Sequence, residues 1–106
     1  MSKVRIGTHA YQIVYIDKVG ESDDWGQADF DALKIWLSTE LQKPEMASKW
    51  AEILLHESAH IILSEVGVEF PADDAEERCV TQLAKGLTQF MLHNKTLIRT
   101  LLKALK

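Results

Sequence analysis

The stretch ILLHESAHIIL, residues 53–63, places two histidines and a glutamate inside the most apolar segment of this 106-residue chain. His56 and His60 are four residues apart, and Glu57 directly follows the first histidine. Burying such polar groups costs free energy unless each finds a partner. The stretch therefore decides both the element around which the chain folds and the chemistry expected of it.

A central helix is predicted around this stretch, over residues 45–66. Gly67, which follows it, is a residue type that commonly ends helices. Apolar residues recur along it at helical spacing: Trp50, Ile53, Leu54, Ile61 and Ile62. Between residues 53 and 63 the segment is apolar on nearly every side. A helix that is apolar nearly all round belongs in the interior.

The segments on either side predict one small α+β domain over residues 1–106. Residues 3–16 and 32–38 are rich in β-branched and aromatic types and predict antiparallel strands, with a polar loop between them. Residues 73–93 predict a second helix, with Asp73 and Glu76 spaced as a capping box. Strands followed by helices are typical of the α+β class.

The last twelve residues, KTLIRTLLKALK, carry basic residues on one helical side and leucines on the other. The basic side would be solvated or would contact an acidic partner. The leucine side is expected to lie on the core or on a second subunit. The sequence leaves the oligomeric state open.

Composition excludes several classes of protein. The net charge is −4, which gives no basic footprint for direct nucleic-acid binding. We expect no membrane span, because no apolar run approaches about 18 residues. One cysteine, Cys79, permits no internal disulfide, and the N-terminus lacks the pattern of a secretory signal. These features predict a cytoplasmic protein.

The spacing of the two histidines predicts a metal site. On a helix, residues four apart lie on nearly the same side, so His56 and His60 could direct two imidazoles at one Zn²⁺ ion. Glu57, rotated by about 100°, would lie beside a water on that ion and accept its proton as general base. The alternative is two hydrogen-bonded helix histidines beside a solvated glutamate. The apolar surroundings favour zinc.

A third ligand must come from another part of the chain. The extended motif with a glycine three residues and a histidine six residues after the second histidine is absent, because those positions are Leu63 and Val66. Carboxylates are available at the start of the second helix, which could return antiparallel to the first: Asp73, Asp74, Glu76 and Glu77. Helical face geometry does not choose between Glu76 and Glu77.

The sequence resembles a known family. HESAH (56–60) followed by EERCVTQLA (76–84) is similar to the compact zinc metallopeptidases of the ImmA/IrrE type, particularly short phage- and prophage-encoded versions. VRIGTHAYQIVYIDKVG (4–20) and GQADFDALKIWLSTELQ (26–42) resemble their opening hairpin and edge strand. The resemblance covers most of the chain and implies a minimal zincin-like fold with Zn²⁺ as cofactor.

The resemblance also selects among the glutamates. In this family the ligand glutamate precedes a small or apolar residue by three positions and an apolar–Ala pair by six and seven. Val80, Leu83 and Ala84 have that spacing from Glu77, so the resemblance implies His56, His60 and Glu77 as ligands. The family often has Asn or Asp four residues after the ligand, whereas this chain has Thr81.

The implied activity is hydrolysis of a peptide bond in a protein or peptide substrate, with a regulatory protein as one candidate. The substrate would lie as an extended strand beside an edge strand at 32–38. Tyr11, Tyr15 and His93 are candidates, without a choice among them, for stabilising the oxyanion. The alternative function is a non-catalytic, peptidase-derived module that binds a partner protein, with or without metal.

Overall fold

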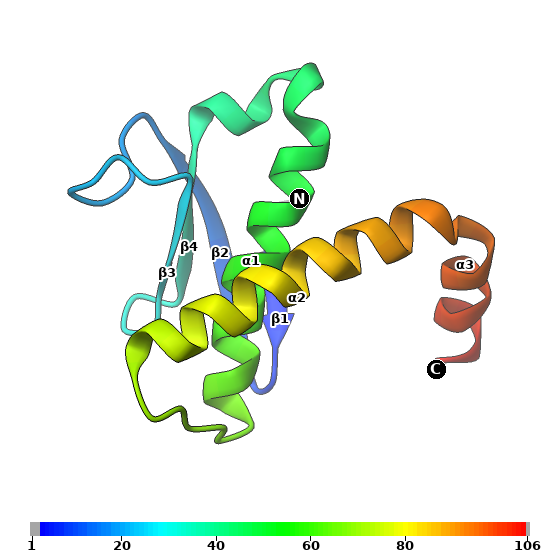
Figure 1. Cartoon of the computed structure of the whole chain (residues 1–106). Coiled ribbons are helices and arrows are strands. Elements are labelled where there is room, and N and C mark those ends of the chain that lie inside the picture. Colours follow the sequence, from blue (N-terminus) through cyan, green and yellow to red (C-terminus); the bar gives the residue numbers. More distant parts are fainter. Residues whose placement is uncertain (1–2, 106) are drawn as a thin grey trace.

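The computed structural model describes residues 3–105, which form a four-stranded mixed sheet followed by three helices (Figure 1). The predicted α+β class is confirmed. The elements in chain order are β1 (Lys3–Ile6), β2 (His9–Ile16), β3 (Gly26–Asp29), β4 (Lys34–Ser38), the 3₁₀ turns η1 (Thr39–Gln42) and η2 (Pro44–Met46), α1 (Ala47–Glu65), α2 (Asp73–His93) and α3 (Lys95–Ala104).

The sheet has the strand order β1-β2-β4-β3. The predicted opening hairpin is present, with β1 antiparallel to β2 and Gly7 at a φ of 61° in its turn. The expectation for residues 32–38 is wrong in two respects: β4 is parallel to β2, and it lies inside the sheet instead of at an edge. Strand β3, from a segment predicted as loop, pairs antiparallel with β4 and forms that edge.

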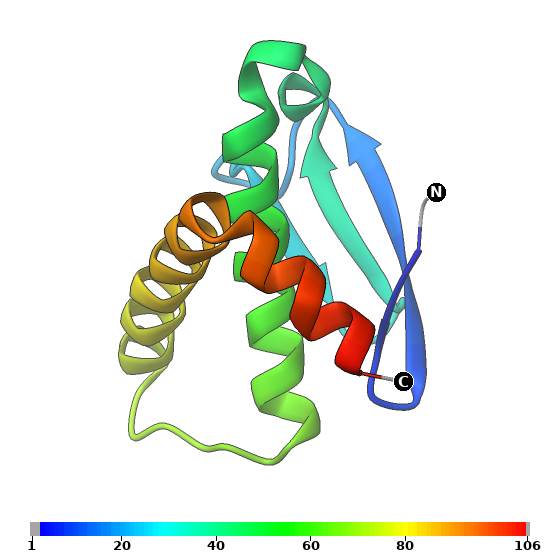
Figure 2. The ribbon, with the colours of Figure 1, turned by 90° about the vertical axis from the view of Figure 1, so that its right-hand side faces the viewer.

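The core lies between the sheet and α1. Ile35 and Leu37 of β4 and Ile61 of α1 are fully buried, and Tyr11 is 2 % exposed beside them. Figures 1 and 2 show α1 between the sheet on one side and α2 on the other. The predicted central helix is thus confirmed, although it begins at Ala47 because Pro44 opens a 3₁₀ turn first.

Helix α2 spans the predicted residues, but its start differs from the predicted capping box. Ala72 occupies the N-cap position and makes no side-chain cap bond, while Asp73 is already helical. The Glu76 side chain turns toward α1 and forms a hydrogen bond with His60. A helix start at Ala72 leaves this carboxylate free for a tertiary contact.

The apolar side of the last helix does not reach the core. Leu101 is 46 % exposed and Leu105 is 75 % exposed. In Figure 1, α3 lies at the far end of α2, away from the sheet. Among residues 3–105, no helix combines the length and apolar character needed to cross a membrane.

Gly26 lies where β3 approaches α1 closely, and Gly26→Ala is expected to destabilise the fold by about 1–3 kcal/mol. A Cβ atom there would lie 2.8 Å from Cγ2 of Ile53 and 3.1 Å from Cδ2 of Leu37. Urea denaturation would measure the loss. Gly86→Ala is the matched control, because its Cβ would meet nothing within 4 Å and would raise helix propensity. An equal change in the free energy of unfolding for both variants would contradict the close approach at Gly26.

Candidate metal centre

His56 and His60 lie on one side of α1, as their spacing predicts. Their Nε2 atoms are 3.3 Å apart, and the two rings are roughly edge to face. Both side chains are largely buried, with 15 % and 18 % of their surface exposed. Helical geometry alone brings these two nitrogens to one point.

Glu77, the fifth residue of α2, reaches the same point from the neighbouring helix. Its Oε1 atom lies 2.8 Å from Nε2 of His60 and 3.3 Å from Nε2 of His56. Its Oε2 atom lies 3.4 Å from the Thr81 hydroxyl, which can donate a hydrogen bond to it. Thr81, the position that departs from the family pattern, thus helps to orient this carboxylate.

Glu76 occupies a different place from Glu77. Its Oε2 atom lies 2.6 Å from Nδ1 of His60, on the opposite side of the ring from the shared point. Since a carboxylate accepts hydrogen bonds, the hydrogen atom belongs on Nδ1. Glu76 therefore fixes the tautomer and orientation of His60, and the Nε2 lone pair faces His56 and Glu77.

Nε2 of His60 and Oε1 of Glu77, both acceptors, therefore face each other beside Nε2 of His56. A hydrogen atom on Nε2 of His56, a second proton on His60 or a metal ion would each satisfy these acceptors. Burial lowers the pKa of His60, but its hydrogen bonds to Glu76 and Glu77 outweigh this, so the pKa lies above its usual value. The geometry also fits zinc. Bond lengths of 2.0–2.1 Å in a tetrahedral site place neighbouring ligand atoms about 3.3–3.4 Å apart. The two distances to Nε2 of His56 are 3.3 Å and match this spacing, while the distance between His60 and Glu77 is shorter, at 2.8 Å.

Glu57 lies beside these residues without joining them. It is 9 % exposed, and its Oε2 atom is 4.0 Å from Nε2 of His56. Burial raises the pKa of Glu57 above its usual value, while His56, His60 and a hydrogen bond from the backbone N–H of Ala28 act in the opposite direction. The carboxyl group is therefore held in place by β3 and is available for proton transfer.

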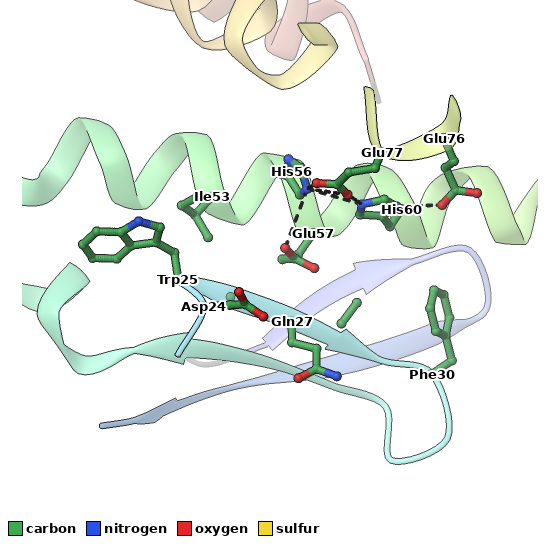
Figure 3. A pocket seen from close by; sticks show the side chains of 12 residues that line it. Asp24, Trp25, Gln27, Phe30, Ile53, His56, Glu57, His60, Glu76 and Glu77 are labelled. Carbon is green, nitrogen blue, oxygen red and sulfur yellow. Dashed lines mark hydrogen bonds and ion pairs between the residues drawn. The ribbon is translucent and has the colours of Figure 1, made fainter. Parts of the chain in front are cut away.

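An open cavity of about 490 Å³ lies in front of these side chains, between β3, α1 and the start of α2. Figure 3 shows Trp25 and Phe30 at opposite ends of β3 and Glu57 between them. Trp25 is 41 % exposed and Phe30 is 46 % exposed. Both rings therefore lie at the surface beside the cavity and are not packed in the core.

The three candidates for oxyanion stabilisation lie outside this cavity. Tyr11 is buried in the core, and the Tyr15 hydroxyl accepts a hydrogen bond of 2.9 Å from Nε1 of Trp50. His93 is at the C-terminal end of α2, far along that helix from Glu77. The residues that do line the cavity, apart from the histidines and glutamates, are Asp24, Trp25, Gly26, Gln27, Ala28, Phe30 and Ile53.

Comparison with known proteins gives no relative. No family model matches the chain, and no curated protein or solved structure matches it. The interpretation of this centre therefore depends on its own geometry.

Proposed function

We propose that this protein is a zinc-dependent peptidase that hydrolyses a peptide bond in an extended substrate. The observation that carries the proposal is the convergence of His56 Nε2, His60 Nε2 and Glu77 Oε1 at one point, with Glu57 and an open cavity beside it. A structural zinc site would be closed by four protein ligands, whereas a catalytic site keeps one position open. Three ligand atoms facing a cavity fit the second description.

Each residue of the candidate metal centre would have its own role in hydrolysis. His56, His60 and Glu77 would hold Zn²⁺, which supplies a Lewis acid that polarises the scissile carbonyl and lowers the pKa of a water. Glu76 would keep His60 in the required tautomer. Glu57 would accept a proton from the attacking water and then donate it to the leaving amine.

Strand β3 would bind the substrate. One edge of β3 pairs with β4, and no strand within residues 3–105 pairs with its other edge. An extended peptide added there would form backbone hydrogen bonds along Gly26–Asp29, the strand that also donates a hydrogen bond to Glu57. Trp25 and Phe30 would offer apolar contacts at the two ends of this segment (Figure 3).

The proposal is tested first by metal content and hydrolysis together. The purified chain is expected to hold about one zinc per molecule by mass spectrometry and to cleave members of a mixture of unstructured peptides, with cleavage abolished by a chelator and restored by Zn²⁺. A chain that stays free of metal in zinc-supplemented buffer would overturn the proposal. Zinc binding without any cleavage would instead favour the non-catalytic protein-binding module.

A further inference from the structure

The charge of this chain is divided sharply along its length. All 16 acidic residues lie at or before Glu77, together with six of the twelve basic residues. The remaining six basic residues lie from Arg78 onward, where there is no acidic residue at all. The sheet, α1 and the start of α2 therefore carry a net charge of −10, and the rest of the chain carries +6.

The basic part is also the part with the most exposed apolar surface. We call residues 78–105, which comprise most of α2 and all of α3, the C-terminal arm. Thirteen large hydrophobic residues of the described chain are exposed, and eight of them lie on this arm. These eight are Leu83, Leu87, Phe90, Leu92, Leu97, Leu101, Leu102 and Leu105.

Helix α3 is too short to be stable by itself. It has ten residues, and a helix of that length is marginal in water without packing. Its two sides differ strongly in character, with Leu97 and Leu101 on one side of the helix and Arg99 and Lys103 on the other. The leucines stay exposed because α3 turns away at the far end of α2 (Figures 1 and 2). These leucines are therefore available for contact with another molecule.

The acidic part of the molecule also has an exposed apolar surface, and acidic side chains lie next to it. At the end of α1 and in the following loop, Ile62, Val66 and Val68 are 47 %, 67 % and 43 % exposed. Glu69 and Asp73, both exposed, lie next to them in the same loop and at the start of α2. This apolar surface with acidic neighbours complements an apolar helix with basic neighbours.

We propose that two copies of this chain form a dimer in which α3 of each copy covers the Ile62, Val66 and Val68 surface of the other. The basic residues of α3 then face Glu69 and Asp73 of the partner. Because every copy carries both surfaces, one two-fold axis satisfies both pairs of contacts and closes the assembly. The pairing brings the arm of one copy, which carries a charge of +5 over residues 78–105, to the −10 part of the other, whereas pairing arm with arm would place like charges together. The proposal is independent of the proposed catalytic function.

Such a dimer would bury only a small share of the surface that each copy exposes. A stable interface covers about 800 Å² on each partner, roughly a tenth of the 7517 Å² that the chain exposes. Each copy would contribute twice, once through its arm and once through its acidic surface. Apolar helix faces of this kind at a symmetric interface are typical of permanent dimers.

The test is sedimentation of the full chain, with Leu101→Lys compared with Thr96→Lys. Both variants add one positive charge to α3, but Leu101 lies on the leucine side and Thr96 on the basic side. We expect the wild type and Thr96→Lys to be dimeric at about 10 µM, and Leu101→Lys to raise the dissociation constant at least tenfold. The rest of the chain should stay folded in Leu101→Lys, because α3 does not contribute to the core. Circular dichroism would check this.

A second variant tests the acidic side of the proposed contact. Glu69→Lys reverses one charge next to the Ile62, Val66 and Val68 surface and is expected to weaken the dimer severalfold, with a smaller effect at about 1 M salt because the charges are then screened. A wild type that remains monomeric up to about 100 µM would overturn the proposal. So would a dimer that Leu101→Lys leaves unchanged. A monomer that binds vesicles of anionic lipid would assign the arm to a membrane surface instead.

Discussion

Replacing His60 by alanine is expected to lower the affinity of the chain for Zn²⁺ by more than about 100-fold. The imidazole supplies one of only three side-chain atoms at the candidate centre, 3.3 Å from Nε2 of His56 and 2.8 Å from Oε1 of Glu77. Zinc bound by a full protein site is held by about 10–16 kcal/mol, so losing one ligand of three removes several kcal/mol. Competition with a chromophoric chelator would measure the change.

Two further variants make this measurement specific. His9→Ala is the matched control, because His9 pairs with Glu65, the last residue of α1, and is not part of the cluster. It is expected to bind zinc as the wild type does. Glu76→Gln is expected to lower the affinity for zinc about 10–100-fold, which is the usual effect of removing a group that orients a metal-bound histidine. Glu77→Gln should lower the affinity for zinc about as much as His60→Ala does. If His60→Ala and His9→Ala bind zinc with equal affinity, the three side chains do not form a metal site.

The relation between Glu76 and Glu77 shows what sequence alone could not decide. Two adjacent helix residues point about 100° apart, so the packing of α2 on α1 determines which of them faces Nε2. In the structure Glu77 faces it, and Glu76 reaches Nδ1 of the same ring. Both carboxylates therefore contact His60, one on each nitrogen, an arrangement that neither spacing nor composition indicates.

The elements that were predicted well are those fixed by local periodicity. The i, i+4 relation of His56 and His60 follows from helix geometry, and α2 has the predicted bounds of 73 and 93. Strand β3 could not be found this way. Its four residues, GQAD, include no β-branched or aromatic side chain, and it is a strand only because β4 supplies its backbone partners.

The position of β4 was missed for a related physical reason. Residues 34–38 lie parallel to β2 with β3 between them in the chain, so their neighbours depend on a non-local connection. Both Ile35 and Leu37 are fully buried, as an interior strand requires. The consequence for the site is direct: the edge available to a substrate belongs to β3, which also positions Trp25 and Phe30.

Replacing Glu57 by glutamine is expected to lower kcat for peptide hydrolysis by about 10²–10⁴-fold, the usual contribution of a general base, with zinc content unchanged. Glutamine has nearly the same shape and can still accept the hydrogen bond from the Ala28 N–H, but it cannot take a proton from water. The carboxylate is next to the ligands yet 4.0 Å from Nε2 of His56, so a direct role in holding zinc is not expected.

Glu52→Gln provides the matched control for this last prediction. Glu52 lies on the same helix, pairs with Lys49 at 3.5 Å, and does not line the cavity in front of the histidines. It should leave both zinc content and kcat unchanged. If Glu57→Gln cleaves peptides at the wild-type rate, the proton acceptor is another group. If it loses zinc, Glu57 is itself part of the metal centre and its role as a separate general base is excluded.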